Sequence, residues 1–376
     1  MRKWPVVALA LLSFGCGESD PVLVVSGDPD GPRNVSAAYY NLGVDVTWDL
    51  SPGWNGEAFR VYGKRASDAD FFFIAEVTSC AEGSCLYRDL NVLSDVTYEY
   101  FVAAVDPDTG SEASSAIVGV YVPLPIPPAV PTNLAGVALD NAAYLIWSDA
   151  PASEGDFSFY RVYIVDGPDD LLLGETDSPG FIDLLAVNGS TFTYFVTSVD
   201  DQGHESGGSF LVEVTPRPDY TGELMNTYQD APGNAGFQFQ ESEDAAAVMS
   251  GDDPDRHFRL ESDVDGLWLV PGPGVEIYPT GQFTSALKCG VGADGDCTSW
   301  EVAPTSGYAF GDVPVDAEFT YMFRVPGFGG GLNYGAIRVT LLGQDQAGDD
   351  VMVFDWAYQI QEGNPNLSTA EGSVLR

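Results

Sequence analysis

A strand pattern that occurs twice, 94 residues apart from Asp89 to Asp183, is the feature that most constrains the fold of this chain. In each copy, bulky side chains alternate with small or polar ones. This period of two places one row on a buried sheet face and the other toward water. Each copy ends in a polar turn, which is typical of a β-hairpin. The sequence therefore predicts a tandem all-β repeat. Its matching segments are Tyr87–Asp89, Thr97–Val102 and Val105–Asp106 in the first copy, and Phe181–Asp183, Thr191–Val196 and Val199–Asp200 in the second.

Length and charge limit the number of domains and the classes of partner. A chain of 376 residues is too long for one core and predicts about two to three domains. Asp and Glu number 56 against 15 Lys and Arg, which gives a formal net charge of −41. Such a surface repels phosphate backbones and anionic lipids, so we expect no nucleic-acid partner.

The N-terminus has the pattern of an export signal. Arg2 and Lys3 precede a short apolar run, Val6–Leu12, and Cys16 follows a small residue. This pattern resembles a bacterial lipoprotein signal, although Ser13 stands where that family usually has Leu. The resemblance implies lipidation of Cys16 and a lipoprotein anchored at the cell envelope or cell surface, with ordinary secretion as the alternative. Residues 17–31, which are rich in Asp, Gly, Pro and Ser, are predicted to be a flexible tether.

The remaining cysteines form two close pairs in the sequence, Cys80 with Cys85 and Cys289 with Cys297. Close pairs in an exported protein predict two local disulfides. Zinc is the alternative, but the spacings differ from common zinc motifs and the chain has only two histidines.

Further landmarks in residues 32–216 resemble the fibronectin type III family. They include a tryptophan that ends an early strand (Trp48 and Trp147) and an Arg-Val-Tyr strand (60–62 and 161–163). The resemblance implies two immunoglobulin-like sandwiches of seven strands, at 32–122 and 131–216, that act as spacers or adhesion modules. A Pro-rich linker at 123–130 separates them.

One difference between the copies has a predicted structural consequence. In this family a corner tyrosine uses its hydroxyl to bond backbone upstream. Tyr98 holds that place in the first copy, whereas the second copy has Phe192. We therefore expect the second sandwich to lack this hydrogen bond.

Residues 219–376 show no copy of the repeat and predict a third all-β domain, either a sandwich or a barrel. Several β-like runs are separated by Gly and Pro turns, and none shows sustained helical periodicity. We expect the last three runs to form a meander. These runs are 319–325, 336–342 and 352–360.

The sequence offers little support for a cofactor. The C-terminal domain faintly resembles exported haemophore lipoproteins, which bind haem iron through two histidines, but only His257 lies in this domain. We expect His257 to be a surface or strand-edge residue and the chain to hold no cofactor. Calcium is the alternative, since Asp252–Asp255, Asp294–Asp296 and Asp345–Asp350 offer oxygen ligands, although none has EF-hand spacing.

The sequence also lacks a catalytic signature. His204 and His257 are the only histidines, no Gly-x-Ser-x-Gly motif is present, and a carboxylate pair cannot be selected among 56 acidic residues. We therefore predict that the chain is not an enzyme.

We predict a surface-anchored binding, adhesion or scaffolding protein whose C-terminal domain is the recognition head. The alternative is an accessory component, hydrolytic or not, of a polysaccharide-degrading or nutrient-uptake system. A glycan or protein ligand is expected to contact aromatic residues, although burial in the core would explain each of them as well. These candidate residues are Trp268, Tyr278, Trp300 and Tyr308.

Overall fold

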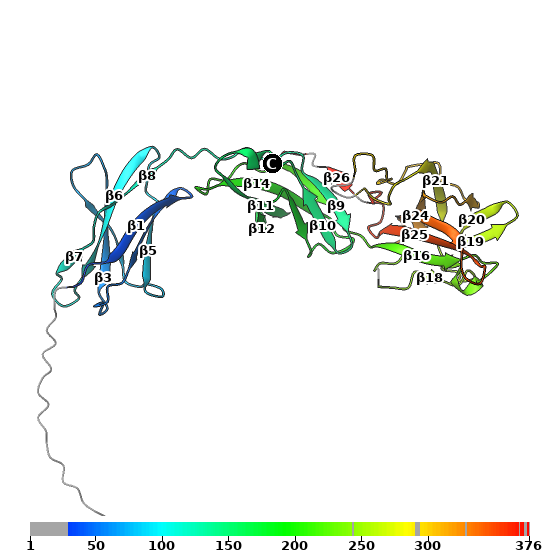
Figure 1. Cartoon of the computed structure of the whole chain (residues 1–376), viewed down its shortest axis with the longest axis horizontal. Helices are drawn as coiled ribbons and strands as arrows, with labels where there is room; N and C mark the ends of the chain where they lie inside the picture. Colours follow the sequence, from blue (N-terminus) through cyan, green and yellow to red (C-terminus); the bar gives the residue numbers. More distant parts are fainter. Residues whose placement is uncertain are drawn as a thin grey trace, which may run out of the picture. The chain divides into compact units, whose positions relative to one another are not determined.

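The computed structural model describes residues 29–242, 244–289, 294–327, 329–367, 369–371 and 374–375 (Figure 1). Within these ranges the chain is built of antiparallel strands, with two short 3-10 turns and no α-helix, so the all-β prediction is confirmed. The described part also contains no helix that is long and apolar enough to cross a membrane. Cys16, the predicted lipidation site, lies outside the described residues.

The chain forms two compact units that divide between Leu124 and Pro125, inside the Pro-rich segment. The first unit is one sandwich. The second unit contains another sandwich of the same kind and the C-terminal domain. The finer domain boundaries drawn from the sequence remain predictions.

The first sandwich has two sheets whose strand order is the one expected of a fibronectin type III module. One sheet has the order β1 (Arg33–Tyr40), β2 (Gly43–Asp49), β5 (Ser84–Asp89). The other has the order β4 (Phe72–Val77), β3 (Ala58–Arg65), β6 (Val96–Val105), β7 (Glu112–Ser114), and β8 (Val118–Val122) also pairs with β6.

The core of this sandwich follows the period of two that the sequence predicted. Alternate residues of β2 and β3 are buried, and Trp48 packs edge-on against Phe59 with ring centroids 5.6 Å apart. The predicted Cys80–Cys85 disulfide is present. Because Cys85 lies in β5 and Cys80 follows β4, this disulfide links the two sheets at one end of the core.

The second sandwich repeats this strand order and gains one strand in each sheet from the end of the chain (Figure 1). The first sheet has the order β13 (Gly180–Asp183), β10 (Ala142–Ile146), β9 (Ala135–Leu139), β26 (Thr369–Glu371). The other has the order β12 (Asp169–Thr176), β11 (Phe157–Asp166), β14 (Phe192–Asp200), β15 (Phe210–Val214), β27 (Val374–Leu375). The two edge strands β9 and β15 are therefore covered by backbone from a distant part of the sequence.

A buried Tyr–Asp hydrogen bond recurs in both copies. The Tyr100 hydroxyl donates to Asp89 Oδ2 and the Tyr194 hydroxyl donates to Asp183 Oδ2, each at 2.9 Å. All four residues are less than 10% exposed, and burial, aided by the nearby carboxylate, raises the pKa of each tyrosine. The aspartate that marks the repeat in the sequence is therefore the acceptor of a core hydrogen bond.

The corner-tyrosine prediction is also confirmed. In the first sandwich the Leu93 N–H donates to the Tyr98 hydroxyl at 2.9 Å, five residues upstream. The second sandwich has Phe192 at this place, packed against its core without a hydroxyl to accept such a bond.

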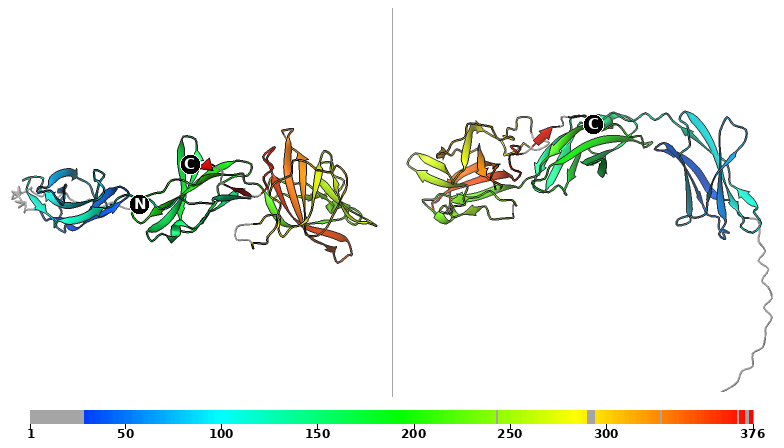
Figure 2. Two further views of the ribbon diagram at one scale, coloured as in Figure 1. Left: turned by 90° about the horizontal axis from the view of Figure 1, so that it is seen from above. Right: turned by 180° about the vertical axis from the view of Figure 1, so that it is seen from behind.

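The C-terminal domain is a sandwich of two five-stranded sheets, coloured from yellow-green to red in Figure 2. The first sheet has the order β16 (Asp219–Asn226), β25 (Asp350–Gln359), β24 (Leu332–Gln344), β23 (Phe319–Pro326), β21 (Glu276–Phe283). The second has the order β18 (Val248–Met249), β17 (Gly236–Phe237), β19 (Phe258–Asp263), β20 (Gly266–Pro271), β22 (Val313–Pro314). The predicted meander is present as β23, β24 and β25, and the barrel alternative is not realised.

The first of these two sheets, the one that contains β23, is buried on both faces. One row of β23, with Tyr321 and Phe323, joins the main core between the sheets. The opposite row, with Met322, joins a smaller core on the other face. Since both rows contain fully buried residues, this sheet has a second cover besides its partner sheet.

His257, predicted to be a surface or strand-edge residue, lies at the start of a strand and is half-buried. It directly precedes β19, and its Nδ1 accepts a hydrogen bond from the Phe239 N–H at 3.0 Å. Its ring lies near Phe239 and Tyr358, with centroid distances of 5.6 and 6.3 Å. Burial lowers the pKa of His257 to about 4, so the ring is neutral at pH 7.

Replacing either buried tyrosine should destabilise its own sandwich. We expect Tyr100→Phe and Tyr194→Phe each to lower the free energy of unfolding by about 1.5 to 3 kcal/mol, because a bond to a buried carboxyl group is lost. Tyr98→Phe should cost about 0.5 to 1.5 kcal/mol. Native-state hydrogen exchange measures the free energy of unfolding of each sandwich separately. Amides of β3 and β6 report on the first sandwich, and amides of β11 and β14 report on the second. A larger cost for Tyr98→Phe than for Tyr100→Phe would contradict this assignment.

The lowered pKa of His257 predicts an acid-sensitive C-terminal domain. The unfolded imidazole binds its proton near pH 6.5, whereas the folded one does so only near pH 4. Stability should therefore be full above about pH 6.5 and fall as the pH drops toward 4. Between pH 7.0 and pH 5.0 we expect the free energy of unfolding of the His257→Gln variant to fall by about 2 kcal/mol less than that of the wild type. Denaturant titrations at pH 7.0 and 5.0 measure this difference. An equal fall in the free energy of unfolding for wild type and variant would refute the prediction.

Candidate binding groove

A long connection covers the second face of the sheet that contains β23. This connection, here called the cap segment, comprises residues 284–312 between β21 and β22 and is described except for 290–293. Leu287 and Ala303 of the cap segment pack with Met322, Ala336 and Ala357 of the sheet in the smaller core. The cap segment therefore supplies the cover that this face needs.

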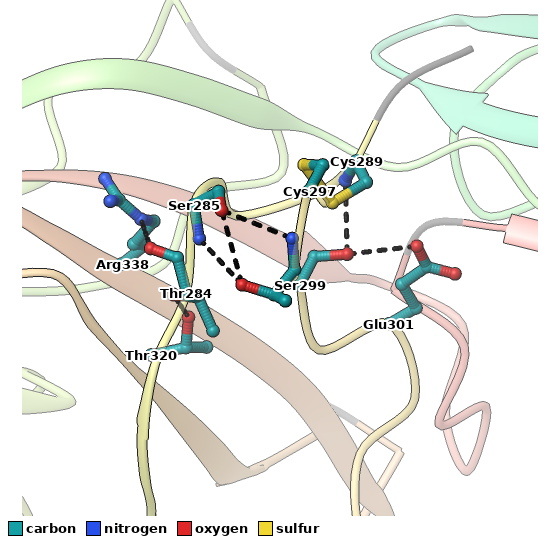
Figure 3. Close-up of a disulfide and its surroundings, with 9 residues drawn as sticks. Thr284, Ser285, Cys289, Cys297, Ser299, Glu301, Thr320 and Arg338 are labelled. Atoms are coloured by element: carbon teal, nitrogen blue, oxygen red, sulfur yellow. Dashed lines mark hydrogen bonds between the residues drawn. A yellow bond between two sulfur atoms is a disulfide. The ribbon is translucent and has the colours of Figure 1, made fainter. Parts of the chain in front are cut away.

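The Cys289–Cys297 disulfide, predicted from the sequence, closes the cap segment on itself (Figure 3). Beside it, the Cys289 N–H donates to Ser299 Oγ at 3.1 Å, and the Ser299 hydroxyl donates to Glu301 Oε1 at 3.0 Å. The Ser285 N–H donates to the Thr298 hydroxyl at 3.2 Å. A disulfide and side-chain hydrogen bonds thus take the place of a regular strand ladder in this part of the chain.

The start of the cap segment is fixed to the sheet through Thr284, which is buried. The hydroxyls of Thr284 and Thr320 share a hydrogen bond of 2.7 Å, and Arg338 Nε donates to the Thr284 carbonyl at 2.9 Å (Figure 3). The Thr284 N–H donates to the Glu318 carbonyl at 2.9 Å. These contacts hold the preceding residue, Phe283, at the edge of the domain.

An open groove of about 680 Å³ lies between the end of β21 and the cap segment. Phe283 is 68% exposed and packs against Phe319, with ring centroids 4.6 Å apart. The groove combines aromatic and aliphatic surface with hydroxyl, amide and carboxylate groups. It is lined by Gln282, Phe283, Thr284, Cys289, Cys297, Thr298, Ser299, Trp300, Glu301 and Val302.

Tyr278 contacts Trp300 at the smaller core, and Tyr308 in turn contacts Tyr278. The ring of Tyr278 lies 6.0 Å from Trp300 and 5.6 Å from Tyr308 between centroids. The Arg324 guanidinium lies 4.0 Å from the centroid of the Tyr308 ring, in cation–π geometry, and Arg324 Nη2 donates to the Thr305 carbonyl at 2.6 Å. Burial raises the pKa of Tyr308 to about 12, with Arg324 opposing this shift. Of these three aromatic candidates, Trp300 lines the groove, Tyr278 packs against Trp300, and Tyr308 packs against Tyr278.

Trp268, the fourth aromatic candidate, lies elsewhere. It belongs to β20 in the other sheet, and its indole N–H donates to Asp263 Oδ1 at 2.9 Å, which lowers the pKa of Asp263. It lines a separate hollow of about 230 Å³. The structure therefore does not bring Trp268 to the groove.

An ion cluster joins the cap segment to the second sandwich. Lys288, next to Cys289, pairs with Asp219, and Arg217 pairs with the same carboxylate at 3.0 Å. Arg217 is fully buried, and its backbone N–H donates to the Leu139 carbonyl of β9 at 3.1 Å. Burial lowers the pKa of Lys288, and the nearby Arg217 adds to this effect. Lys288 therefore links the cap segment to the start of β16, and Arg217 links the same carboxylate to β9 of the second sandwich.

The described residues contain no group of three or more His, Cys, Asp or Glu side chains placed to hold a metal ion. Two of the acidic clusters cap their own turns: Asp253 Oδ1 accepts from the Asp255 N–H at 2.9 Å, and Asp345 Oδ1 accepts from the Ala347 N–H at 2.7 Å. Calcium binding remains an untested alternative.

Neither histidine belongs to the groove. His204 follows β14 in the second sandwich, is 5% exposed, and its Nδ1 lies 2.8 Å from Asp200 Oδ2. It is thus part of a buried turn, and His257 lies at the main core of the C-terminal domain. The Ser299 hydroxyl in the groove is bonded to a carboxylate, and the groove lining includes no imidazole.

Phe283 and Glu301 are groove residues that the sequence reasoning missed. Phe283 ends a strand after the polar residues Gly281 and Gln282, and nothing in its local pattern distinguishes an exposed ring from a buried one. The one sequence signal for this groove was the Cys289–Cys297 pair. It predicts a disulfide-closed loop between strands, but it does not predict which residues the loop contacts.

Of the comparisons with known proteins, the one with solved structures found similar chains. No protein-family model matches the chain, and no curated protein matches it. One similar structure is the crystal structure of chicken CNTN1 FN1-FN3 domains, with a TM-score of 0.38 and 16% identity over 51% of this chain and 69% of that chain. Another, described as "Myokine structure", has a TM-score of 0.22 and 25% identity over 26% of this chain and 99% of that chain. The likeness of the two smaller sandwiches to the fibronectin type III fold is therefore drawn from their own strand order and core.

Proposed function

We propose that this chain is an exported binding protein whose C-terminal sandwich recognises a neutral carbohydrate in the groove beside the Cys289–Cys297 disulfide. The observation that supports this most directly is the composition of the groove. An exposed ring, Phe283, and a braced one, Trp300, lie among hydroxyl, amide and carboxylate groups. Binding sites of this kind combine apolar surface with a few polar groups that fix orientation.

A neutral sugar matches this composition better than other ligand classes. The C–H faces of a sugar ring can pack on aromatic rings, while its hydroxyls can donate to Glu301 and exchange hydrogen bonds with Gln282 and Ser299. Anionic ligands are disfavoured because the chain has a formal net charge of −41. A purely apolar ligand would leave the polar groups of the groove without partners.

The rest of the chain has a supporting role in this proposal. Two disulfides favour an oxidising compartment outside the cytosol. The pattern ending at Cys16 supports lipid anchoring, and the sandwiches between tether and head would act as spacers that hold the groove away from the membrane. We propose a non-catalytic role, because hydrolysis of a glycoside uses a pair of carboxylates and Glu301 is the one carboxylate among the described residues that line the groove.

The groove aromatics should be required for carbohydrate binding. Against a panel of neutral polysaccharides in affinity gel electrophoresis, we expect the wild-type chain to be retarded by at least one. Phe283→Ala should weaken this binding by about tenfold or more, or about 1.4 kcal/mol, because a sugar face loses its apolar contact. Trp300→Ala should weaken it further.

Trp268→Phe provides the matched control, since it alters an aromatic residue of the same domain outside the groove, and its binding should equal that of the wild type. Melting curves must show that Phe283→Ala remains folded, as its 68% exposure predicts. Failure of the whole panel to bind, or equal binding by Phe283→Ala and wild type, would overturn the proposed function.

A further inference from the structure

The chain contains two Asn-Gly dipeptides, Asn55-Gly56 and Asn188-Gly189. In such a pair the backbone nitrogen of the glycine can attack the side-chain carbonyl carbon of the asparagine, because glycine has no Cβ to hinder the approach. Whether a pair reacts depends on how firmly the asparagine side chain and the glycine N–H are held. The two pairs of this chain differ in that respect.

Asn55-Gly56 lies in an exposed loop of the first sandwich, between β2 and β3. Within the part of the chain that the structure describes, no hydrogen bond engages the Asn55 side chain or the Gly56 N–H. A Cβ added to Gly56 would meet no atom within 4 Å, and its φ of 94° is one that glycine adopts readily. Both reacting groups are therefore free to approach each other.

The contacts inside this loop leave the reacting groups free. The Trp54 N–H donates to the Ser51 carbonyl, and the Trp54 indole N–H donates to the Glu57 carbonyl, both at 3.1 Å. The Asn55 backbone N–H donates to Glu57 Oε2 at 2.6 Å. The loop is thus fixed on either side of the pair, and its contacts use the backbone N–H of Asn55 rather than that of Gly56.

Asn188-Gly189, in the second sandwich, is restrained at each reacting group. Asn188 Nδ2 donates to Asp140 Oδ1 at 2.5 Å, and Asn188 Oδ1 accepts from the Asn141 N–H at 2.8 Å. The Gly189 N–H donates to the Pro216 carbonyl at 2.9 Å. Because the nitrogen that would attack and the amide that it would attack are both engaged, this pair can react only after local opening.

We infer that Asn55 is a site of spontaneous deamidation, with water as the co-reactant, and that the fold protects Asn188. The Gly56 nitrogen loses its proton to solvent and forms a bond to Asn55 Cγ. The bond from Cγ to Nδ2 breaks, and the Nδ2 group takes up a proton from solvent and leaves as ammonia. Water then adds to either carbonyl of the cyclic imide and opens it, which leaves aspartate or isoaspartate at position 55.

The product alters the loop in two ways. The new carboxylate lies close to that of Glu57, which accepts the Asn55 N–H, so like charges repel within the loop. Isoaspartate also adds one carbon atom to the main chain. The first sandwich therefore gains a negative charge and a looser loop with age, in a chain whose formal net charge is already −41.

The test is peptide mapping by mass spectrometry of the folded whole chain after incubation at pH 8.0. We expect first-order conversion of Asn55 into a mixture of aspartate and isoaspartate. Asn188 should convert at least about tenfold more slowly, because it reacts only from an opened state. In urea with the disulfides reduced, the two sites should react at similar rates, since each is followed by glycine.

Asn55→Gln is the matched control. The Asn55 side chain is exposed and makes no hydrogen bond in the described part of the chain, so the variant should fold normally. Glutamine would have to form a larger ring, so position 55 should stay unchanged while Asn188 keeps its wild-type rate. Equal rates at Asn55 and Asn188 in the folded chain, an intact Asn55, or a product that is aspartate alone would overturn the inference.

Discussion

The C-terminal domain depends on the burial of one sheet on both of its faces. A strand such as β23 carries apolar side chains in both rows, so neither face is stable in contact with water. The partner sheet covers one face and the cap segment covers the other. The described part of the cap segment contains no strand, and a disulfide, a serine–glutamate hydrogen bond and the Thr284 contacts hold it in place. The groove is a consequence of this construction, because it forms where the cover meets the edge of the sheet.

Much of the fold could be predicted because it follows from local periodicity. Alternation of side chains located the strands, and the 94-residue repeat located two sandwiches with Trp48 and Trp147 in their cores. The buried bonds of Tyr100 to Asp89 and Tyr194 to Asp183 were not predicted, although all four residues stand in the repeat. The strands that the chain end adds to the second sandwich could not be predicted. Their pairing joins residues more than 150 positions apart, and no local pattern specifies it.

The candidate site was predictable only in part, for a related reason. Aromatic residues in a glycine-rich domain suggested Trp300 as a ligand contact, and Trp300 lines the groove, but the same criterion selected Trp268, which lies in the other sheet. Tyr278 packs against Trp300 without lining the groove, and Tyr308 packs against Tyr278. Phe283 was missed because its exposure is decided by Thr284 and Arg338, which fix the chain beside it. Composition identifies residues that could bind, whereas tertiary contacts decide which of them face solvent.

The central claim is that the cap segment, closed by the Cys289–Cys297 disulfide, forms the recognition surface. Removing this disulfide, with removal of the Cys80–Cys85 disulfide as the control, tests the claim directly. The measurement is carbohydrate binding by the Cys289→Ala/Cys297→Ala double variant, compared with Cys80→Ala/Cys85→Ala, with melting curves for both. The account predicts that the first variant loses binding while its sheets stay folded, because only the cap segment loosens. The second should retain binding, since its disulfide lies in the first sandwich. Full binding by the first variant, or equal loss in both while both remain folded, would contradict the account.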